Sequence, residues 1–197
     1  MIELHEYLLL GQGNARYCYI HPEDSSKLIK VEKTRDAQKQ QNTIDYIYYS
    51  YLKAQNVDLS SISTCYHWVE TSIGAGLVFE RIENFDNSPA LTFEQAIIQR
   101  TISKETQEQL LNQLKSYLET NCILFVDVSL SNIMCKKVDD DQWQLIIVYG
   151  LGARRLKLQF WLQRRIKMYA HFKIRKQWNV LMGNYRRLLT PESVTSK

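Results

Sequence analysis

The sequence has no apolar run long enough to cross a bilayer, which takes roughly 20 residues. Its longest uncharged apolar stretches, such as 145–151, are far shorter. The first ten residues mix Glu3, His5 and Glu6 with apolar residues, and so lack the basic head and apolar core of a secretory signal. With 45% hydrophobic and 23% charged residues among 197, the composition is that of an ordinary globular protein. We therefore expect a soluble, cytoplasmic protein that makes no membrane contact.

Closely spaced cysteine or histidine pairs are also missing. The four cysteines and the four histidines are scattered, at Cys18, Cys65, Cys122, Cys135, His5, His21, His67 and His171. Disulfide scaffolds are denser in cysteine, and zinc sites need ligands at short, regular spacings. We expect reduced core thiols and no structural zinc.

Acidic residues are scarce at the end of the chain. Residues 151–197 hold 12 Lys and Arg against Glu192 alone, whereas residues 1–150 hold 13 against 20, which gives charges of +11 and −7. Arg and Lys between 154 and 176 could form a surface for an acidic protein partner, with nucleic acid the less favoured ligand. A solvated helical face beside the acidic first half explains the same pattern. Both interpretations stay open.

Alternating apolar patterns predict five strands in the first half of the chain, at 7–10, 17–20, 27–31, 65–70 and 76–82. Leu28 and Lys30 fall on the same face of the third strand, because side chains alternate along a strand. Residues 36–54 carry apolar residues at helical spacing and predict one helix.

The second half is predicted to contain helices at 92–100 and 105–118 and a hairpin of strands at 133–138 and 143–149. Thr92 and Gln95 have the spacing of a capping box. The amphipathic stretch 156–189 is predicted to break into two helices near Ala170, and the tail after Pro191 is expected to be disordered.

Gly11 and Gly13 lie between the first two predicted strands, where residues without a Cβ allow tight turns and close approach to a phosphate. Arg16 stands where the usual G-x-G-x-x-G pattern has its third glycine. Lys30 on the third strand could neutralise nucleotide phosphates, and Asp45 on the following helix is the carboxylate expected to fix its rotamer. A glycine-rich hairpin turn and a solvated lysine explain the same residues, so both interpretations stay open.

Asp127 and Asn132 stand five positions apart in a polar segment between a predicted helix and the hairpin. A carboxylate there can accept or orient a hydroxyl proton, and an amide oxygen can ligate a magnesium ion. A D-x-x-x-x-N pair occurs by chance in many proteins, but this position is that of a kinase catalytic loop. The order of these residues after Lys30 therefore favours an ATP-handling kinase fold.

Several segments together carry a family resemblance: GQG at 11–13, KLIK at 27–30, GLVFE at 76–80, LSNIM at 130–134 and YGLG at 149–152. CYIHPED at 18–24 and NFD at 84–86 add to it. The chain resembles, over nearly its whole length, the bacterial YrbL family, a small protein-kinase-like group linked by name to the PhoP regulatory network.

This resemblance implies an α+β, two-lobed protein-kinase-like fold. The N-terminal lobe would span 1–86, with a five-stranded antiparallel sheet and one helix. A reduced, mostly helical C-terminal lobe would span 87–190, followed by a disordered tail at 191–197.

The resemblance also implies ATP and magnesium as ligands. Residues at the nucleotide would be Gly11, Gly13, Lys30, Glu80, Arg81 and Ile82, the last three near the adenine. The implied catalytic residues are Asp127 as proton acceptor, Lys30 under the glycine loop and Asp45 as the helix acid. Asn132 would ligate the metal.

One expected carboxylate is absent. Kinases hold magnesium with the aspartate of a D-F-G element, and the matching position here is Tyr149, a phenol with an ordinary pKa of about 10. Phenols are poor ligands for magnesium. We therefore expect a kinase-like ATP-binding protein with impaired or absent phosphotransferase activity, a pseudokinase. Two alternatives remain: an active atypical kinase that uses Asp127 and Asn132, and a non-enzymatic adaptor that binds nucleic acid or an acidic partner through basic C-terminal helices.

Overall fold

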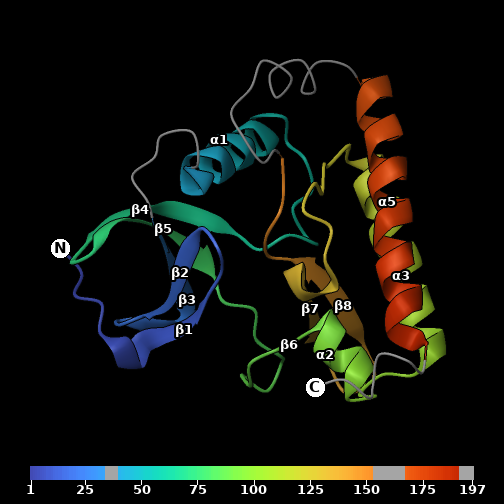
Figure 1. The fold of residues 1–197 in the computed structure, drawn as a ribbon, viewed down its shortest axis with the longest axis horizontal. Coiled ribbons are helices and arrows are strands. Elements are labelled where there is room, and N and C mark those ends of the chain that lie inside the picture. The colour runs from blue at the N-terminus through green and yellow to red at the C-terminus, as the bar shows by residue number, and fades with distance from the viewer. Residues whose placement is uncertain (34–39, 153–166, 191–197) are drawn as a thin grey trace.

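The computed structural model describes residues 1–33, 40–152 and 167–190. A five-stranded antiparallel sheet forms the first half, in the spatial order β1-β2-β3-β5-β4 (Figure 1). Its strands are β1 (Leu9–Gln12), β2 (Arg16–His21), β3 (Asp24–Glu32), β4 (Cys65–Thr71) and β5 (Gly74–Glu80). The predicted five-stranded antiparallel sheet is confirmed, with shifted boundaries.

Two of those shifts affect the glycine segment and the first turn. The 3-10 helix η1 (Glu6–Leu8) covers much of the strand predicted at 7–10, and β1 continues instead through Gly11, which pairs with Cys18. Likewise β3 begins at Asp24, inside the polar stretch 21–26. Pairing with β2 determines where β1 ends and where β3 begins. The backbone groups of these residues form strand hydrogen bonds even though their side chains are small or polar.

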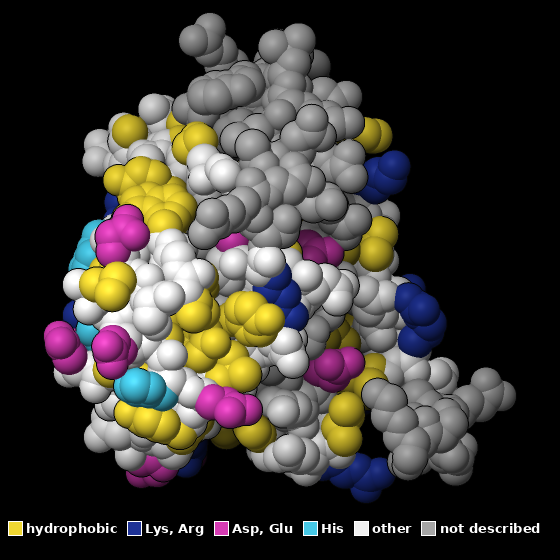
Figure 2. All heavy atoms as spheres, turned by 60° about the vertical axis from the view of Figure 1, so that its left-hand side comes forward, with side chains coloured by type: hydrophobic (Ala, Val, Ile, Leu, Met, Phe, Trp, Pro, Cys, Tyr) yellow, Lys and Arg dark blue, Asp and Glu magenta, His cyan; other side chains and the backbone are white. Residues whose placement is uncertain are grey.

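The two faces of β3 have different surroundings. Ile29 and Val31 are buried with Val78 on the outer face, where Ile2 and Leu4 from the N-terminal segment cover them. The opposite face carries Lys30 and Leu28, as the alternation predicts. Seen with the sheet side forward (Figure 2), hydrophobic side chains gather in the middle of this side of the molecule beside a basic side chain.

Helix α1 (Gln41–Ala54) packs against β3 and β5 of the first sheet and lies above the sheet in Figure 1. Its buried face includes Ile44, Tyr48, Tyr49 and Leu52, at the spacing of three and four that defines one side of a helix. The ring of Tyr49 meets the ring of Phe79 on β5 edge to face, with 5.8 Å between centroids. The predicted helix at 36–54 is thus observed from Gln41, and 36–39 lie outside the described residues.

The second half is mainly helical, with one small sheet. It comprises β6 (Leu91–Thr92), α2 (Phe93–Ile98), α3 (Lys104–Thr120), η3 (Leu130–Asn132), β7 (Ile133–Lys137), β8 (Trp143–Ile147) and α5 (Lys167–Leu189). Strands β6, β7 and β8 form a three-stranded antiparallel sheet. The capping box of Thr92 and Gln95 forms as predicted. The helices predicted at 92–100 and 105–118 and the predicted hairpin are confirmed with small changes of boundary.

Helix α5 corrects one prediction, because it continues through Ala170 without a break. Ala170, Ile174, Trp178, Leu181 and Tyr185 are all buried and repeat at intervals of three and four, so a single stripe runs along the helix. This stripe packs against the cluster to which α3 contributes, and the two helices lie side by side in Figure 1. Residues 156–166 of the predicted segment, and the tail expected to be disordered, lie outside the described residues.

Residues 61–63 join the two halves. The amide of Ser63 donates to the carbonyl of Ile147 at 3.0 Å, and the amide of Ile147 donates to the carbonyl of Ser61 at 2.9 Å. The largest buried cluster accordingly contains Phe79 from the first sheet and Leu114 from α3. Among the helices that the structure describes, we find none with the length and apolar content of a membrane span.

Replacing Gly152 by alanine should destabilise the protein. Gly152 has φ of +75°, and a Cβ there would lie 2.7 Å from Cγ of the buried Tyr48. The left-handed backbone alone penalises a residue with a side chain by about 1–3 kcal/mol, and the clash adds to this. Urea unfolding measures the change. In the matched control Gly183→Ala, inside α5 and with open space around it, stability should instead rise by about 0.5–1 kcal/mol. Equal midpoints for the two variants would contradict this packing.

Candidate functional site

A cavity of about 700 Å³ lies between the first sheet and the second half of the chain. Residues separated by more than a hundred positions line it. Those from the first half include Gly13, Arg16, Lys30, Glu80, Arg81 and Ile82, and those from the second half include Asp127, Asn132 and Tyr149. Gly11 and Asp45, also expected at the site, are not among the lining residues.

Lys30 reaches the cavity from the inner face of β3 and is 8% exposed. Its Nζ donates to the carbonyl of Val148 at 2.8 Å and lies 3.9 Å from the centroid of the Phe79 ring. The amide of Val148 in turn donates to the carbonyl of Asn132 at 3.0 Å. Lys30 and Asn132 therefore line the same cavity and are linked through the backbone of Val148.

The environment of Lys30 disfavours its charge. Burial, and then the neighbouring Arg16 guanidinium, lower the pKa of Lys30 to about 8. A carbonyl and an aromatic ring stabilise an ammonium less than a bonded carboxylate does. The cavity wall thus carries a cation whose charge is only partly compensated.

The expected ion pair between Lys30 and Asp45 is not observed. Asp45 pairs with Arg16 instead. The carboxylate Oδ2 accepts from Nη1 of Arg16 at 2.7 Å, and Oδ1 accepts from Gln41 at 3.1 Å. Nη1 of Arg16 also donates to Oδ1 of Asn42 at 2.7 Å. Arginine keeps its charge when buried and lysine readily loses it, so Arg16 is the better partner for a carboxylate that is itself 4% exposed.

The loop from Asp127 to Asn132 is held by backbone contacts on both sides. Nδ2 of Asn132 donates to the carbonyl of Asp127 at 2.8 Å, so its amide oxygen is the atom left to meet a ligand. The amide of Asp127 donates to the carbonyl of Gly150 at 3.1 Å. Gly150 has φ of +87°, and a Cβ there would lie 2.7 Å from Cβ of Asp127. Only glycine allows this close approach, which fixes the loop beside 148–150.

The remaining expected residues contribute in different ways. At Gly13 a Cβ would meet nothing within 4 Å, so the segment is open towards the cavity. The carboxylate of Glu80 accepts from the amide and the hydroxyl of Thr64, at 3.0 and 2.9 Å. Arg81 pairs with Glu83 at 3.4 Å. The side chains of Glu80 and Arg81 are thus occupied, and Ile82 adds an apolar wall.

Tyr149 lies beside Arg16, with Cζ of the guanidinium 4.8 Å from the centroid of the ring. Burial raises the pKa of the Tyr149 hydroxyl, so the phenol stays neutral at physiological pH. The oxygen donors at this end of the cavity include Asp127 and Asn132, but a cation occupies the position next to Tyr149. Within residues 1–33, 40–152 and 167–190 no three His, Cys, Asp or Glu side chains are grouped as metal ligands. This donor set does not fit a kinase-type magnesium site.

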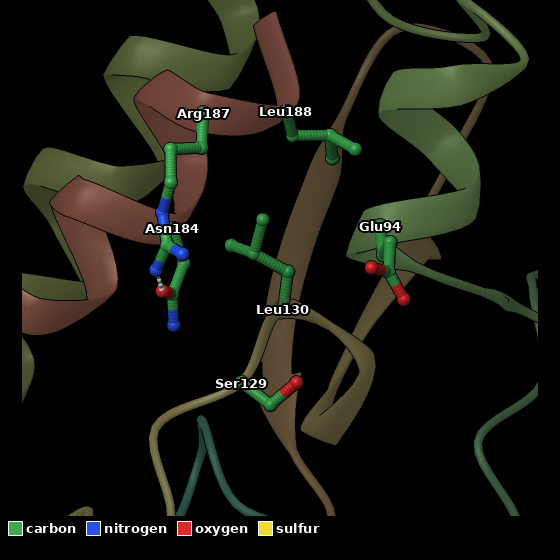
Figure 3. A pocket seen from close by; sticks show the side chains of 6 residues that line it. All are labelled: Glu94, Ser129, Leu130, Asn184, Arg187 and Leu188. Atoms are coloured by element: carbon green, nitrogen blue, oxygen red, sulfur yellow. Dashed lines mark hydrogen bonds between the residues drawn. The ribbon is translucent and has the colours of Figure 1, made fainter. Parts of the chain in front are cut away.

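A smaller cavity of about 290 Å³ lies behind the Asp127 loop (Figure 3). Leu130 from η3 and Leu188 from α5 both reach into it, and Arg187 folds onto Oδ1 of Asn184. Nδ2 of Asn184 donates to the carbonyl of Val128 at 3.2 Å. The end of α5 therefore supports the loop that carries Asp127.

Sequence reasoning noticed Arg16 only as the residue in place of a third glycine, and it missed Asn42 and Phe79. Strand pairing brings Arg16 to α1, because Arg16 pairs with Glu32, whose Oε1 accepts from the amide of Asn42 on α1. Of the basic residues proposed to form a surface, Lys173, Arg175 and Lys176 lie on α5, and those at 154–165 lie outside the described residues.

A family model described as PhoP regulatory network protein YrbL matches residues 2–186. The chain belongs to the YrbL family. It is 32% identical over 159 residues to proteins named "Uncharacterized protein YrbL" from Escherichia coli (strain K12) and Shigella flexneri. Each match covers 79% of this chain and 76% of the relative. The family resemblance carried by the motifs is confirmed.

The burial of Lys30 predicts a specific dependence of stability on pH. Below about pH 8 the ammonium is charged in both the folded and the unfolded chain, and burial of that charge opposes folding. Between about pH 8 and 10.5 the unfolded chain binds more protons, so rising pH stabilises the folded protein, by up to about 1.4 kcal/mol per pH unit. Lys30→Met should therefore be more stable than the unchanged protein at pH 7.

That advantage should shrink between pH 8 and 10.5, and urea unfolding at several pH values measures it. Lys104→Met on α3 is the control, because the Lys104 side chain is 66% exposed and its removal should produce no such convergence. A constant difference between Lys30→Met and the unchanged protein across this range would show that Lys30 is not buried as a cation.

Proposed function

We propose that this YrbL family member is a kinase-like protein that binds a nucleotide such as ATP in the 700 Å³ cavity. The observation that supports this most is the meeting of Lys30 and Asn132 at one cavity, through the hydrogen bonds of Val148. A volume of this size is in the range of small-molecule and cofactor sites. In this proposal Gly13 and Lys30 meet the phosphates and 80–82 meet the base.

We also propose that the first sheet with α1 and the helical second half act as the two lobes of a kinase-like fold, with their boundary near residue 86. The antiparallel order of the sheet and the position of α1 against it support this arrangement. The cavity would then be an interlobe cleft, with residues 61–63 and the segment after β5 as the two connections.

Phosphoryl transfer by this protein would be impaired or absent. Catalysis of this kind rests on positioning and on neutralisation of phosphate charge by metal ions. Asp127 has the position of a proton acceptor, and Asn132 offers an amide oxygen. Tyr149 supplies no carboxylate, and Arg16 lies against its ring. The proposal is therefore nucleotide binding without efficient turnover.

Thermal unfolding in the presence of ATP tests the proposal. A ligand at 100 times its Kd stabilises the folded state by about 2.7 kcal/mol, so a saturable rise in Tm is expected at millimolar ATP. Lys30→Ala should remove this rise, because it deletes the ammonium that faces the cavity. Lys27→Ala on the same strand is the control: Lys27 pairs with Asp24 at 2.8 Å and does not line the cavity. A Tm that does not change at any ATP concentration would exclude the nucleotide site.

A further inference from the structure

Arg16 has an unfilled hydrogen-bonding edge at the cavity. The residue is 5% exposed, and both of its hydrogen bonds, to Asn42 and to Asp45, come from Nη1. Nη2 is buried, and no side chain or backbone group in the described parts of the chain accepts from it. A guanidinium carries five N–H donors in a rigid plane, and buried donors are almost always bonded. Because Arg16 lines the cavity, we take its buried, unpartnered Nη2 as a donor for an acceptor that a ligand would supply.

The charges around Arg16 favour an anion as that ligand. Burial opposes the charge of Arg16, but Asp45 raises the pKa of the guanidinium above its ordinary value, so Arg16 stays a cation. Lys30 is near enough for its own pKa to be lowered by Arg16. The two cations thus repel each other. Asp45 is bonded to Arg16, and Glu32, which pairs with Arg16 across the strands, also stabilises its charge, so the cation left without a bonded carboxylate in the described structure is Lys30. An anion placed between Arg16 and Lys30 would relieve this repulsion.

We propose that Arg16 is the fixed cation that binds the phosphate groups of the ligand, so that phosphate binding needs no divalent metal ion. This inference rests on the proposed function and deepens it. Guanidinium groups recognise phosphate by two parallel charge-assisted hydrogen bonds, and the planar group is already oriented here by Asp45 and Asn42. The half-buried ring of Tyr149 lies over the guanidinium, so binding of a phosphate at Nη2 requires this ring to turn aside.

Free ATP and its magnesium complex should differ in affinity for this site, and a kinase-type site should show the opposite order of affinity. Free ATP carries more negative charge than its magnesium complex and keeps all its phosphate oxygens available. A site built on Arg16 and Lys30 should therefore bind ATP at least as tightly in EDTA as in magnesium chloride. A site that depends on a metal ion should bind ATP only in magnesium chloride.

Calorimetric titration of the full chain with ATP, in EDTA and in magnesium chloride, measures this order. The decisive variant is the double substitution Arg16→Gln/Asp45→Asn, which removes both charges of the buried pair and leaves the net charge unchanged. It avoids the isolated buried charge that a single substitution would leave. Its affinity for ATP in EDTA should fall about tenfold or more, as expected for loss of charge-assisted hydrogen bonds. A cooperative unfolding transition establishes that the variant is folded.

Asp45→Asn alone is the companion variant, because it keeps Arg16 and removes the carboxylate that neutralises it. Since it leaves Arg16 as a buried cation without this partner, a cooperative unfolding transition must first establish that the variant is folded. ATP should bind this variant more tightly in EDTA than it binds the unchanged protein. If Arg16 only holds α1 in place, both variants should instead lose affinity. Adenosine, which has no phosphate, should bind all three proteins equally.

The results distinguish this inference from the proposed function. ATP binding that requires magnesium, or that is the same in the double variant and the unchanged protein, would overturn the role of Arg16 and leave the nucleotide site standing. Absence of ATP binding in both buffers would overturn both proposals. Equal affinity for ATP and for inorganic tripolyphosphate would keep the role of Arg16 and remove the role proposed for 80–82.

Discussion

Arg16 and Asp45 bring two opposite charges out of water where β2 meets α1, with 2.7 Å between Nη1 and Oδ2. Removing one member of such a pair typically costs about 3–5 kcal/mol, because the other charge is left buried without compensation. The pair therefore holds α1 in one position against the sheet. On the same helix the hydroxyl of Tyr48 accepts from the amide of Leu124 at 2.9 Å, three residues before Asp127. The position of the Asp127 loop thus depends on an ion pair about one helical turn from Tyr48 on α1.

The ion pair between Arg16 and Asp45 affects how the charge of Lys30 is stabilised. With its expected carboxylate bonded elsewhere, Lys30 rests on the carbonyl of Val148 and the ring of Phe79. These groups compensate a charge weakly, which is why burial can lower the pKa of Lys30 to about 8. A phosphate in the cavity would restore the full charge of Lys30. The affinity that we propose would therefore come from the same buried, weakly compensated ammonium.

Much of this structure follows from patterns in the sequence. Alternation predicted the inner face of β3 with Leu28 and Lys30, and helical spacing predicted α1, α2 and α3. These predictions succeed because burial of one face determines the period of each element. The partner of Asp45 could not be predicted in this way, since Arg16 and Lys30 lie on neighbouring strands and both can reach the helix. The choice between them depends on how well each cation tolerates burial.

The prediction at Ala170 failed for a related reason. An amphipathic stretch of 34 residues is long for a globular helix, and the described part, Lys167–Leu189, forms one helix because Ala170 and Ile174 continue the stripe that faces α3. Gly11 likewise belongs to the ladder with Cys18, since strand pairing extends beyond the apolar residues that mark the strand in the sequence. In each case a tertiary contact extends an element past the point where local sequence would end it.

Arg16 and Tyr149 are two of the positions where the sequence departs from the kinase pattern, and the fold puts them in contact, with 4.8 Å from guanidinium carbon to ring centroid. A carboxylate at position 149 would lie against Arg16 and pair with it. It would then compete with Asp45 for the same cation, and its charge would be neutralised before any metal ion could use it. A neutral aromatic ring avoids this competition and still stabilises the guanidinium through its π face. If the cavity binds nucleotide as proposed, the two departures are one physical arrangement, in which a permanent cation would take over the role of a metal ion at the phosphates.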